Sequence, residues 1–422
     1  MDRLLITGGK RLSGEVEISG AKNAALPLMA STILCKGETV LRNIPNLKDI
    51  NTMSQVLANM GAAISVEGGC LKINTGSLVN KEAPYELVKT MRASVLTLGP
   101  MVARFGYAKV SLPGGCAIGA RPINLHLMGL EKMGAKITLS RGYVVAKAKR
   151  LKGATIFCDI STVTGTENLM MAAALAKGTT VIENAAREPE VEDLANSLNA
   201  MGAKITGAGC SVIEIEGVDE LHPIDYKIIP DRIETGTFIT IAGITGSNIL
   251  IKNCRADHML AIVEKLRETG ISITEEADGL RVVGPPKGTL HPADIKTMPF
   301  PGFPTDMQAQ FIALVCVAAG TSIVKETIFE NRYMHVAELR RMGANIEIED
   351  NIATVRGVEG LLGAPVMATD LRASASLVVA ALAAEGETVI DRIYHLDRGY
   401  EKIEDKISKL GGDIRRVKAA RA

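Results

Sequence analysis

The chain has 422 residues, 47% of them apolar and 23% charged, so it is long enough for two domains of roughly 200 residues and has the composition of a folded globular protein. Its 48 Lys and Arg residues balance 47 Asp and Glu residues, which excludes the strongly basic character of a nucleic-acid-binding protein. The apolar stretches are shorter than a membrane span, and the opening MDRLLITGGK lacks the apolar core of a signal peptide, so a cytoplasmic location is expected.

One sequence pattern recurs six times. It reads Met, Leu or Thr, then Gly, two further residues and Ile. Its glycines are Gly61, Gly134, Gly202, Gly270, Gly343 and Gly411. Adding 209 to each of the first three positions gives the last three, so the second half of the chain repeats the first half in register. This repeat predicts two lobes of three units each.

The elements of the first unit can be read in chain order. After an initial strand at residues 3–9, whose partners are expected in the last part of the chain, residues 24–36 form a helix rich in Ala, Leu and Met. A β-branched strand follows at 38–45, then a second, amphipathic helix that ends at Gly61, then another strand at 62–73. The later units repeat this order, which predicts an α/β fold of six α-β-α-β units with helices inside and sheets outside.

The lobes are expected to be interleaved along the chain. The first lobe would comprise residues 22–229 and carry the loop around Cys116, and the second would comprise residues 1–21 and 230–422, with residues 220–232 as the returning linker. A purely structural repeat scaffold is the alternative. Solenoids normally have more than three units per continuous stack and capped ends, so a two-lobed enzyme with a cleft fits better.

Six helices open with a polar or charged residue at one aligned position, fourteen residues before the glycine that ends the helix. These residues are Asn23, Arg92, Thr164, Arg232, Asp306 and Arg372. Helix N-termini attract anions and arginine binds phosphate or carboxylate with two hydrogen bonds, so converging helix starts predict an anionic ligand. Thr164 and Asp306 could instead only cap their helices. Arginine is a poor N-cap, so the three arginines are assigned to function or to pairing between lobes, and Asp306 among these cations is a candidate base.

A glycine-rich loop, LPGGCAIGARP at 112–122, lengthens the second unit and holds Cys116. Such a loop is typical of a mobile lid, and the nearby Arg121 would favour a reactive thiolate. An incidental exposed cysteine is the alternative. The other six cysteines form no C-x-x-C pair or zinc-ligand spacing, and most, including Cys35 and Cys316, are expected to be buried. The loop lacks the dinucleotide and P-loop motifs, so neither NAD nor ATP is indicated.

Six motifs in order along the whole chain resemble the UDP-N-acetylglucosamine enolpyruvyl transferases of the EPSP synthase superfamily. They are GAKNAALP (20–27), LPGGCAIGARP (112–122), TGTENLMMAA (164–173), FPTDMQAQ (303–310), DLRASASLV (370–378) and DRGYEKI (397–403). The resemblance implies a two-lobed inside-out α/β barrel. It also implies transfer of the enolpyruvyl group of phosphoenolpyruvate to the 3-hydroxyl of UDP-N-acetylglucosamine, with release of phosphate, as the first committed step of peptidoglycan synthesis. No metal, organic cofactor, nucleic acid or membrane partner is implied.

The resemblance also implies roles for individual residues. Catalysis would involve Cys116 as general acid, Asp306 as base, Lys22 and Arg398. Phosphoenolpyruvate would be bound by Lys22, Asn23, Arg121, Arg398 and Cys116. The nucleotide sugar would contact Asn23, Arg92, Arg121, Pro122, Ile123, Asn124, Leu125, Gly165, Asp306 and Ile328. Arg232, Asp370 and Arg372 would lie around the cleft.

Two other enzymes are weighed against this interpretation. An enolpyruvyl transferase acting on shikimate 3-phosphate would share the fold and the donor, but the cysteine-bearing loop and GAKN at residues 20–23 argue against it. An RNA-end-modifying enzyme built on related repeats is disfavoured by the neutral charge and by an aromatic content of only 3%.

Overall fold

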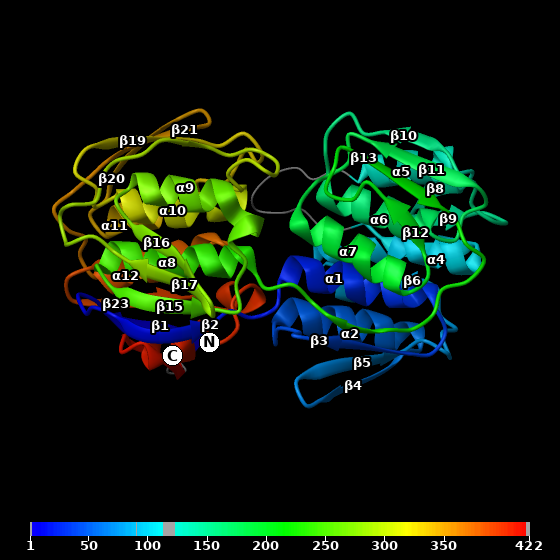
Figure 1. The fold of residues 1–422 in the computed structure, drawn as a ribbon, viewed down its shortest axis with the longest axis horizontal. Coiled ribbons are helices and arrows are strands. Elements are labelled where there is room, and N and C mark those ends of the chain that lie inside the picture. Colours follow the sequence, from blue (N-terminus) through cyan, green and yellow to red (C-terminus); the bar gives the residue numbers. More distant parts are fainter. Residues whose placement is uncertain (1, 90, 113–122, 419–422) are drawn as a thin grey trace. The chain divides into compact units, whose positions relative to one another are not determined.

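The computed structural model describes residues 2–89, 91–112 and 123–418, which form two compact units. Unit 1 contains residues 2–19 and 230–418, and unit 2 contains the described residues between 20 and 229 (Figure 1). Each unit has its own hydrophobic core. No helix in the described ranges is long and apolar enough to cross a membrane.

Each unit carries three four-stranded sheets with one shared topology. In unit 2 the sheets are β14 (Asp225–Lys227), β3 (Glu38–Arg42), β5 (Cys70–Asn74), β4 (Ala63–Glu67); β6 (Glu82–Ala83), β7 (Tyr107–Ser111), β9 (Tyr143–Lys147), β8 (Lys136–Ser140); and β10 (Thr155–Phe157), β11 (Thr179–Glu183), β13 (Val212–Glu216), β12 (Lys204–Thr206). In unit 1 they are β2 (Ser13–Glu17), β15 (Asn248–Lys252), β17 (Gly279–Val283), β16 (Ser272–Glu276); β18 (Ile295–Lys296), β19 (Thr321–Lys325), β21 (Ile352–Arg356), β20 (Asn345–Glu349); and β22 (Pro365–Met367), β23 (Glu387–Asp391), β1 (Asp2–Thr7), β24 (Asp413–Lys418). The first strand of each sheet runs parallel to the second, and the remaining pairs are antiparallel. The expected pairing of the first strand with the end of the chain is confirmed, because β1 lies between β23 and β24.

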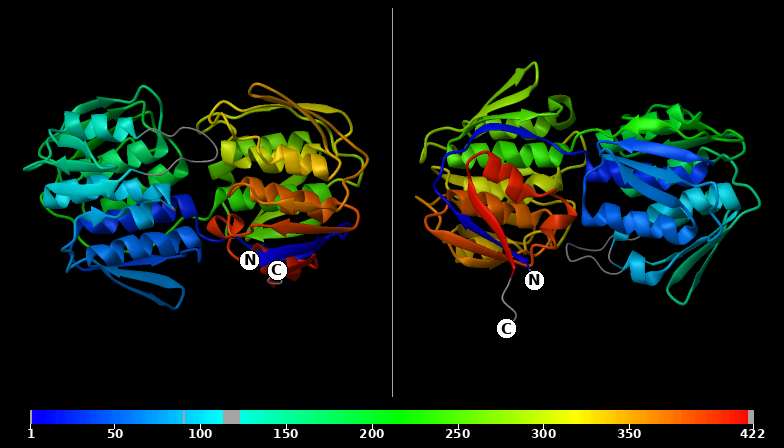
Figure 2. Two further views of the ribbon diagram at one scale, coloured as in Figure 1. Left: turned by 180° about the vertical axis from the view of Figure 1, so that it is seen from behind. Right: turned by 90° about the horizontal axis from the view of Figure 1, so that it is seen from below.

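The first helix of each repeat lies inside the sheets, as expected (Figure 2), whereas second helices such as residues 260–268 keep a face exposed to solvent. Unit 2 contains α1 (Lys22–Ser31), η1 (Thr32–Leu34), α2 (Lys48–Met60), α3 (Tyr85–Val88), η2 (Arg92–Thr97), α4 (Leu98–Phe105), α5 (Asn124–Lys132), α6 (Val163–Ala173) and α7 (Pro189–Ala200). Unit 1 contains α8 (Arg232–Thr245), η3 (Ala256–Met259), α9 (Leu260–Glu268), η4 (Thr305–Met307), α10 (Gln308–Val315), α11 (Val336–Arg341), α12 (Ala373–Ala383), η5 (Leu396–Arg398) and α13 (Ile403–Lys409). In unit 1, α8, α10 and α12 pack against one another and are buried on almost every side. Their mostly apolar sequences match this position. The predicted α/β fold class is confirmed.

The repeated glycines end helices, as the sequence predicts. All six glycines of the recurring pattern have positive φ angles, and so do the six that follow the first helix of each of the six repeats. At Gly61, φ is 106°, and a Cβ atom would lie 2.8 Å from the carbonyl oxygen of Ser77. A side chain there would therefore strain the backbone and clash with the next segment.

Two details of the predicted unit are wrong. The last strand expected in each repeat is a hairpin rather than a single strand. In the first repeat, β4 and β5 are joined by Gly68 and Gly69, both with positive φ. Two residues with positive φ make the tight turn that suits a twisted hairpin. A short parallel strand also precedes each first helix, so residues 220–232, expected as a linker, contain β14.

Asparagine side chains tie three of these short strands to their neighbours. Asn43, Asn184 and Asn253 directly follow β3, β11 and β15, with φ between 51° and 58°. Their Nδ2 atoms donate to the carbonyl oxygens of Ile228 at 3.0 Å, Cys158 at 2.7 Å and Ile18 at 2.6 Å, respectively. Asparagine tolerates this left-handed backbone better than most residues, which explains why it recurs at this position.

Candidate active site

Two of the three aligned residues of unit 1, Asp306 and Arg372, meet in a charged cluster that Asp231 joins from the start of α8. Arg232 begins α8, Asp306 lies in η4 directly before α10, and Arg372 directly precedes α12. Nε of Arg372 lies 3.4 Å from Oδ2 of Asp306, and its Nη2 lies 3.5 Å from Oδ2 of Asp231. Arg372 is only 2% exposed, so its guanidinium group depends on these carboxylates rather than on water.

Asp306 lies between two guanidinium groups. Besides the Arg372 contact, its Oδ1 accepts a hydrogen bond from Nη2 of Arg332 at 2.9 Å. Arg332 is itself buried, and the N-cap of η4 is Pro304, without a side-chain capping bond. These bonds show Asp306 as an acceptor for arginine rather than as a helix cap. Two cations stabilise the negative charge of this carboxylate, and in its ionised form it can accept a proton.

Arg372 pairs with two carboxylates of its own unit, Asp231 and Asp306. Burial lowers its pKa, but Asp231, Tyr400 and Asp306 together raise the pKa above the usual value for arginine. The guanidinium carbon lies 5.2 Å from the ring centroid of Tyr400, whose hydroxyl is in turn hydrogen-bonded to Thr237 at 2.9 Å. The packing therefore fixes a permanently charged group at the start of α12.

Asp370, rather than Arg372, caps α12. Its Oδ1 accepts from the backbone N–H groups of Arg372 and Ala373, both at 2.9 Å. Its Oδ2 is buried without a hydrogen-bond partner in the part of the chain that the structure describes, as are both ring nitrogens of the fully buried His335. Burial lowers the pKa of His335 to about 4, and the nearby Arg332 adds to this effect while Asp370 opposes it. His335 is consequently neutral near pH 7.

Arg398, expected at phosphoenolpyruvate, lies in η5 of unit 1. The preceding residue, Asp397, is held by Arg416 of β24, whose Nη2 and Nη1 lie 2.6 and 3.2 Å from the two carboxylate oxygens. Nε of Arg416 also donates to Glu404 of α13 at 2.5 Å. This bidentate contact fixes the turn that carries Arg398 to the sheet beside it.

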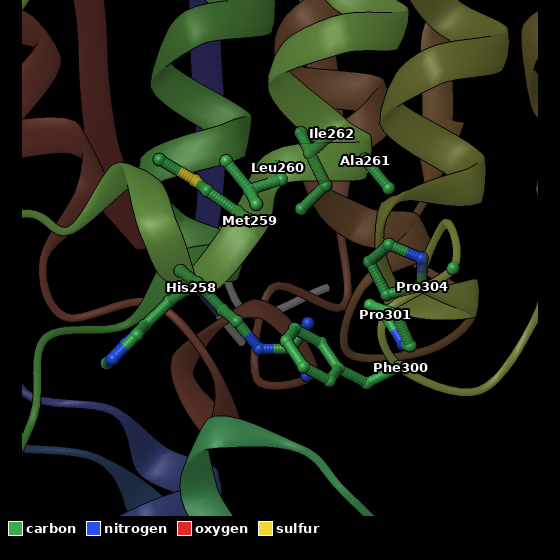
Figure 3. Close-up of a pocket in the computed structure, with 10 residues that line it drawn as sticks. His258, Met259, Leu260, Ala261, Ile262, Phe300, Pro301 and Pro304 are labelled. Atoms are coloured by element: carbon green, nitrogen blue, oxygen red, sulfur yellow. The ribbon is translucent and has the colours of Figure 1, made fainter. Parts of the chain in front are cut away.

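Arg232 is packed beside an aromatic side chain. Its guanidinium carbon lies 5.7 Å from the ring centroid of Phe300, next to a shallow, partly open pocket. Figure 3 shows the two sides of this pocket, which are residues 258–262 of η3 and α9 and the turn at residues 300–304. The lining is mainly apolar, which gives Arg232 a packing environment at the start of α8.

In unit 2, Lys22 and the aligned residue Asn23 open α1. Lys22 is 9% exposed, and its Nζ lies 3.1 Å from Oδ2 of Asp49 in α2. This contact holds the lysine charged at a helix N-terminus, where an anion would gain both the ammonium group and the free N–H groups.

His126 connects the other expected nucleotide-sugar residues of unit 2. Its Nδ1 lies 3.0 Å from Nδ2 of Asn168, whose Oδ1 accepts from the N–H of Gly99 at 2.7 Å. The amide group of Asn168 must then donate to Nδ1, so the ring proton resides on Nε2, which faces Oγ1 of Thr164 at 3.4 Å. Burial and the charge of Arg92 together lower the pKa of His126 to about 4. Arg92 and Thr164 thus meet around a neutral imidazole.

The remaining expected contacts of unit 2 lie beside this histidine. Ile123, Asn124 and Leu125 form the start of α5 directly before His126, with Asn124 exposed. Gly165 follows Thr164, and a Cβ atom there would lie 2.3 Å from Cγ2 of Thr162. Thr162, rather than Thr164, is the N-cap of α6, because its Oγ1 accepts from the N–H of Gly165 at 3.3 Å. The predicted cap was therefore wrong by two residues, although a threonine does cap this helix.

Cys116, Arg121 and Pro122 lie outside the described residues. Of the other cysteines, Cys35, Cys158 and Cys316 are buried, as expected, and burial raises the pKa of each thiol. Burial likewise raises the pKa of Cys254 to about 11. Cys210 is exposed, because it lies in the turn before β13.

The buried histidines predict a loss of stability in acid. Unfolded histidine has a pKa of 6.5, whereas that of His126 is about 4, so between these pH values the unfolded chain binds more protons and the free energy of unfolding falls as the pH is lowered. The full shift corresponds to about 3 kcal/mol. Replacing His126 with glutamine is expected to flatten the decrease in thermal midpoint between pH 6.5 and 4, measured by calorimetry.

A matched control for this experiment is His222→Gln, since the side chain of His222 is 68% exposed. This variant should keep the pH dependence of the unmodified chain. An equal slope in His126→Gln and His222→Gln would show that His126 is not held neutral by burial.

Several residues of these clusters escaped the sequence analysis. Asp49, Arg332 and His126 contact predicted site residues, yet none occupies the aligned helix-start position. Asp231 could have been found, because it directly precedes Arg232 and is a typical N-cap; its Oδ1 accepts from the N–H groups of Ile233 and Glu234 at 2.8 and 3.0 Å.

Comparisons with known proteins agree with this architecture. The EPSP synthase (3-phosphoshikimate 1-carboxyvinyltransferase) family model matches residues 6–407. The solved enolpyruvyl transferase NikO from Streptomyces tendae superposes with a TM-score of 0.89 at 27% identity, covering 99% of each chain. EPSP synthase from Acinetobacter baumannii gives a TM-score of 0.76 at 18% identity, over 99% of this chain and 100% of that one, which supports the fold alone.

Curated relatives are more similar in sequence. The UDP-N-acetylglucosamine 1-carboxyvinyltransferase of Thermodesulfovibrio yellowstonii is 65% identical over 419 residues, covering 99% of this chain and all of the relative. Those of Geotalea daltonii and Myxococcus xanthus are 60% and 58% identical with the same coverage. The chain therefore belongs to the UDP-N-acetylglucosamine 1-carboxyvinyltransferases of the EPSP synthase family.

Proposed function

We propose that this protein transfers the enolpyruvyl group of phosphoenolpyruvate to the 3-hydroxyl of UDP-N-acetylglucosamine and releases phosphate, in the cytoplasm, for peptidoglycan synthesis. The observation that carries the proposal is the 65% identity over 99% of the chain to a protein named for this activity. The Asp306 site supports it, because a carboxylate held by two guanidinium groups, 2.9 and 3.4 Å away, suits a base that acts on a sugar hydroxyl.

The residue roles belong to this proposal. Phosphoenolpyruvate would be bound by Lys22, Asn23, Cys116, Arg121 and Arg398. The nucleotide sugar would be bound by Asn23, Arg92, residues 121–125, Gly165, Asp306 and Ile328. Arg232, Asp370 and Arg372 would line the cleft, and residues 22–229 would form the lobe that carries the Cys116 loop. The buried, paired states of Lys22 and Arg372 support these assignments, since fixed cations stabilise phosphate charge without reorganisation.

The proposed reaction is an addition followed by an elimination. Cys116 protonates the methylene carbon of phosphoenolpyruvate, and the sugar 3-oxygen attacks the resulting cation-like carbon while Asp306 accepts the hydroxyl proton. The adduct then loses a methyl proton and its phosphate, and the double bond re-forms. Arginine and lysine side chains stabilise the departing phosphate, so no metal is required. Exclusion of water during these steps prevents hydrolysis of the reactive adduct.

Phosphate release tests the choice of acceptor. With phosphoenolpyruvate present, we expect release with UDP-N-acetylglucosamine and none above background with shikimate 3-phosphate. Addition of EDTA should leave the rate unchanged. Release only with shikimate 3-phosphate would contradict the proposed acceptor, and loss of activity in EDTA would contradict the metal-free reaction.

A further inference from the structure

Glu326, at the end of β19 in unit 1, is a buried carboxylate to which the sequence analysis assigned no role. It is 2% exposed and accepts hydrogen bonds from three separate segments. Oε1 accepts from Oγ1 of Thr297 at 2.8 Å and from the N–H groups of Ile328 and Phe329 at 2.8 and 3.2 Å. Oε2 accepts from Oγ1 of Thr305 at 2.8 Å.

These bonds connect the two places in unit 1 where the acceptor is proposed to bind. Ile328 lies in the segment 326–332 and is expected near the nucleotide, whereas Thr305 directly precedes Asp306, expected at the sugar hydroxyl. A single carboxylate thus bonds to both the backbone of the nucleotide segment and the turn that carries the base.

The same segment holds this turn a second time. Arg332, at its other end, donates to Asp306 at 2.9 Å and lies 5.6 Å from the ring centroid of Phe329. The residues 326–332 therefore contact two consecutive residues of η4, Thr305 through Glu326 and Asp306 through Arg332. An N–H or O–H donor bonded to a carboxylate forms a stronger hydrogen bond than one bonded to a neutral acceptor, so the connection through Glu326 resists displacement.

The far side of Glu326 is equally fixed. Oγ1 of Thr297, after β18, donates to Glu326 and also accepts from the N–H of Thr327 at 2.9 Å. The N–H of Glu326 donates to the hydroxyl of Tyr333 at 3.1 Å. Among the hydrogen bonds of Glu326 described here, only the bond from the Thr305 hydroxyl connects the carboxylate to η4.

We propose that Glu326 is a positioning residue, which acts through Thr305 to fix the Asp306 carboxylate in register with the nucleotide segment. This inference rests on the function proposed above. It predicts that breaking the link misplaces the base without weakening nucleotide-sugar binding, because the backbone contacts of Oε1 remain. Misplacement of a catalytic group by about 1 Å can lower turnover as much as a hundredfold.

The test uses Thr305, since truncating the buried Glu326 would leave several donors without a partner and could unfold the segment. Thr305→Val removes the hydroxyl with little change in shape and is expected to lower kcat at least about tenfold. The KM for UDP-N-acetylglucosamine should stay within about twofold, and Thr305→Ser, which keeps the hydroxyl, should restore kcat. Thr240→Val is the matched control, because Thr240 is also buried in unit 1 and its hydroxyl bonds to Gly236 of its own helix.

A double variant separates this inference from a general loss of stability. If Thr305 acts through Asp306, Thr305→Val should lower kcat no further once Asp306→Asn is present. Two results would overturn the positioning role. One is a double variant in which the losses of kcat from the two substitutions multiply. The other is a Thr305→Val variant that, like the expected result for Thr240→Val, changes only the thermal midpoint. If the unmodified protein shows no transfer to UDP-N-acetylglucosamine, both the inference and the proposed function fail; if its transfer is normal and Thr305→Val is unaffected, the inference alone fails.

Discussion

Replacing Asp306 with asparagine is expected to lower kcat about a hundredfold or more, because the amide keeps the size and polarity of the side chain but cannot accept the proton of the sugar hydroxyl. The amide oxygen can still accept from Arg332, and Arg372 keeps its contact with Asp231, so the fold should persist. Phosphate release measures turnover, and calorimetric titration with UDP-N-acetylglucosamine should show an affinity close to that of the unmodified protein.

Asp231→Asn is the control for the loss of charge beside Arg372. An asparagine oxygen can still cap α8 as Oδ1 of Asp231 does, while the negative charge at 3.5 Å from Arg372 is lost. If the role of Asp306 is chemical, Asp231→Asn should lose much less turnover than Asp306→Asn. Near-normal turnover in Asp306→Asn would instead assign Asp306 a structural role.

A phosphonate epoxide that resembles phosphoenolpyruvate, such as fosfomycin, is expected to alkylate Cys116. The glycine-rich sequence and the neighbouring Arg121 favour an accessible thiolate, and ordered binding of the sugar should bring the thiol to the donor site. Addition of UDP-N-acetylglucosamine should therefore accelerate labelling. Simple occlusion by the sugar would slow it.

Mass spectrometry of the labelled chain can distinguish Cys116 from the other cysteines. Cys210 is the internal comparison, because it is exposed and would react with a reagent that selects only for accessibility. Cys116→Ala should abolish labelling, whereas Cys116→Asp should abolish labelling but retain activity, since a carboxylic acid can still supply a proton. Labelling at Cys210, or unchanged activity and labelling in Cys116→Ala, would refute the role assigned to Cys116.

The repeat made the fold predictable from the sequence. Glycine is needed wherever a helix ends in a left-handed backbone, so Gly61 and its five counterparts recur with the fold itself. The hairpin at Gly68 and Gly69 was read as one strand because two adjacent β-branched runs with a short glycine turn resemble one longer run. Strand β14 was missed because only its pairing with β3, far away in the sequence, distinguishes it from a linker.

From the repeat alone, without the family resemblance, the charged cluster of unit 1 could be predicted only at the aligned positions. The aligned helix starts identified Asp306 and Arg372, and the structure brings these two together. Arg332 and Glu326 lie within the fifth repeat, between β19 and α11, away from the aligned position. A carboxylate or guanidinium group there has the sequence signature of an ordinary polar residue, and only tertiary packing buries it. Residues that come together from distant segments have no characteristic spacing in the sequence. Their contacts with the site can therefore be recognised only in the structure.

The most direct test of the central claim is the identity of the product. After incubation with phosphoenolpyruvate and UDP-N-acetylglucosamine, mass spectrometry and nuclear magnetic resonance should detect UDP-N-acetylglucosamine carrying one enolpyruvyl group at its 3-oxygen, in amounts equal to the phosphate released. Unmodified nucleotide sugar together with free pyruvate and phosphate, or an enolpyruvyl group found only on shikimate 3-phosphate when both acceptors are supplied, would contradict it.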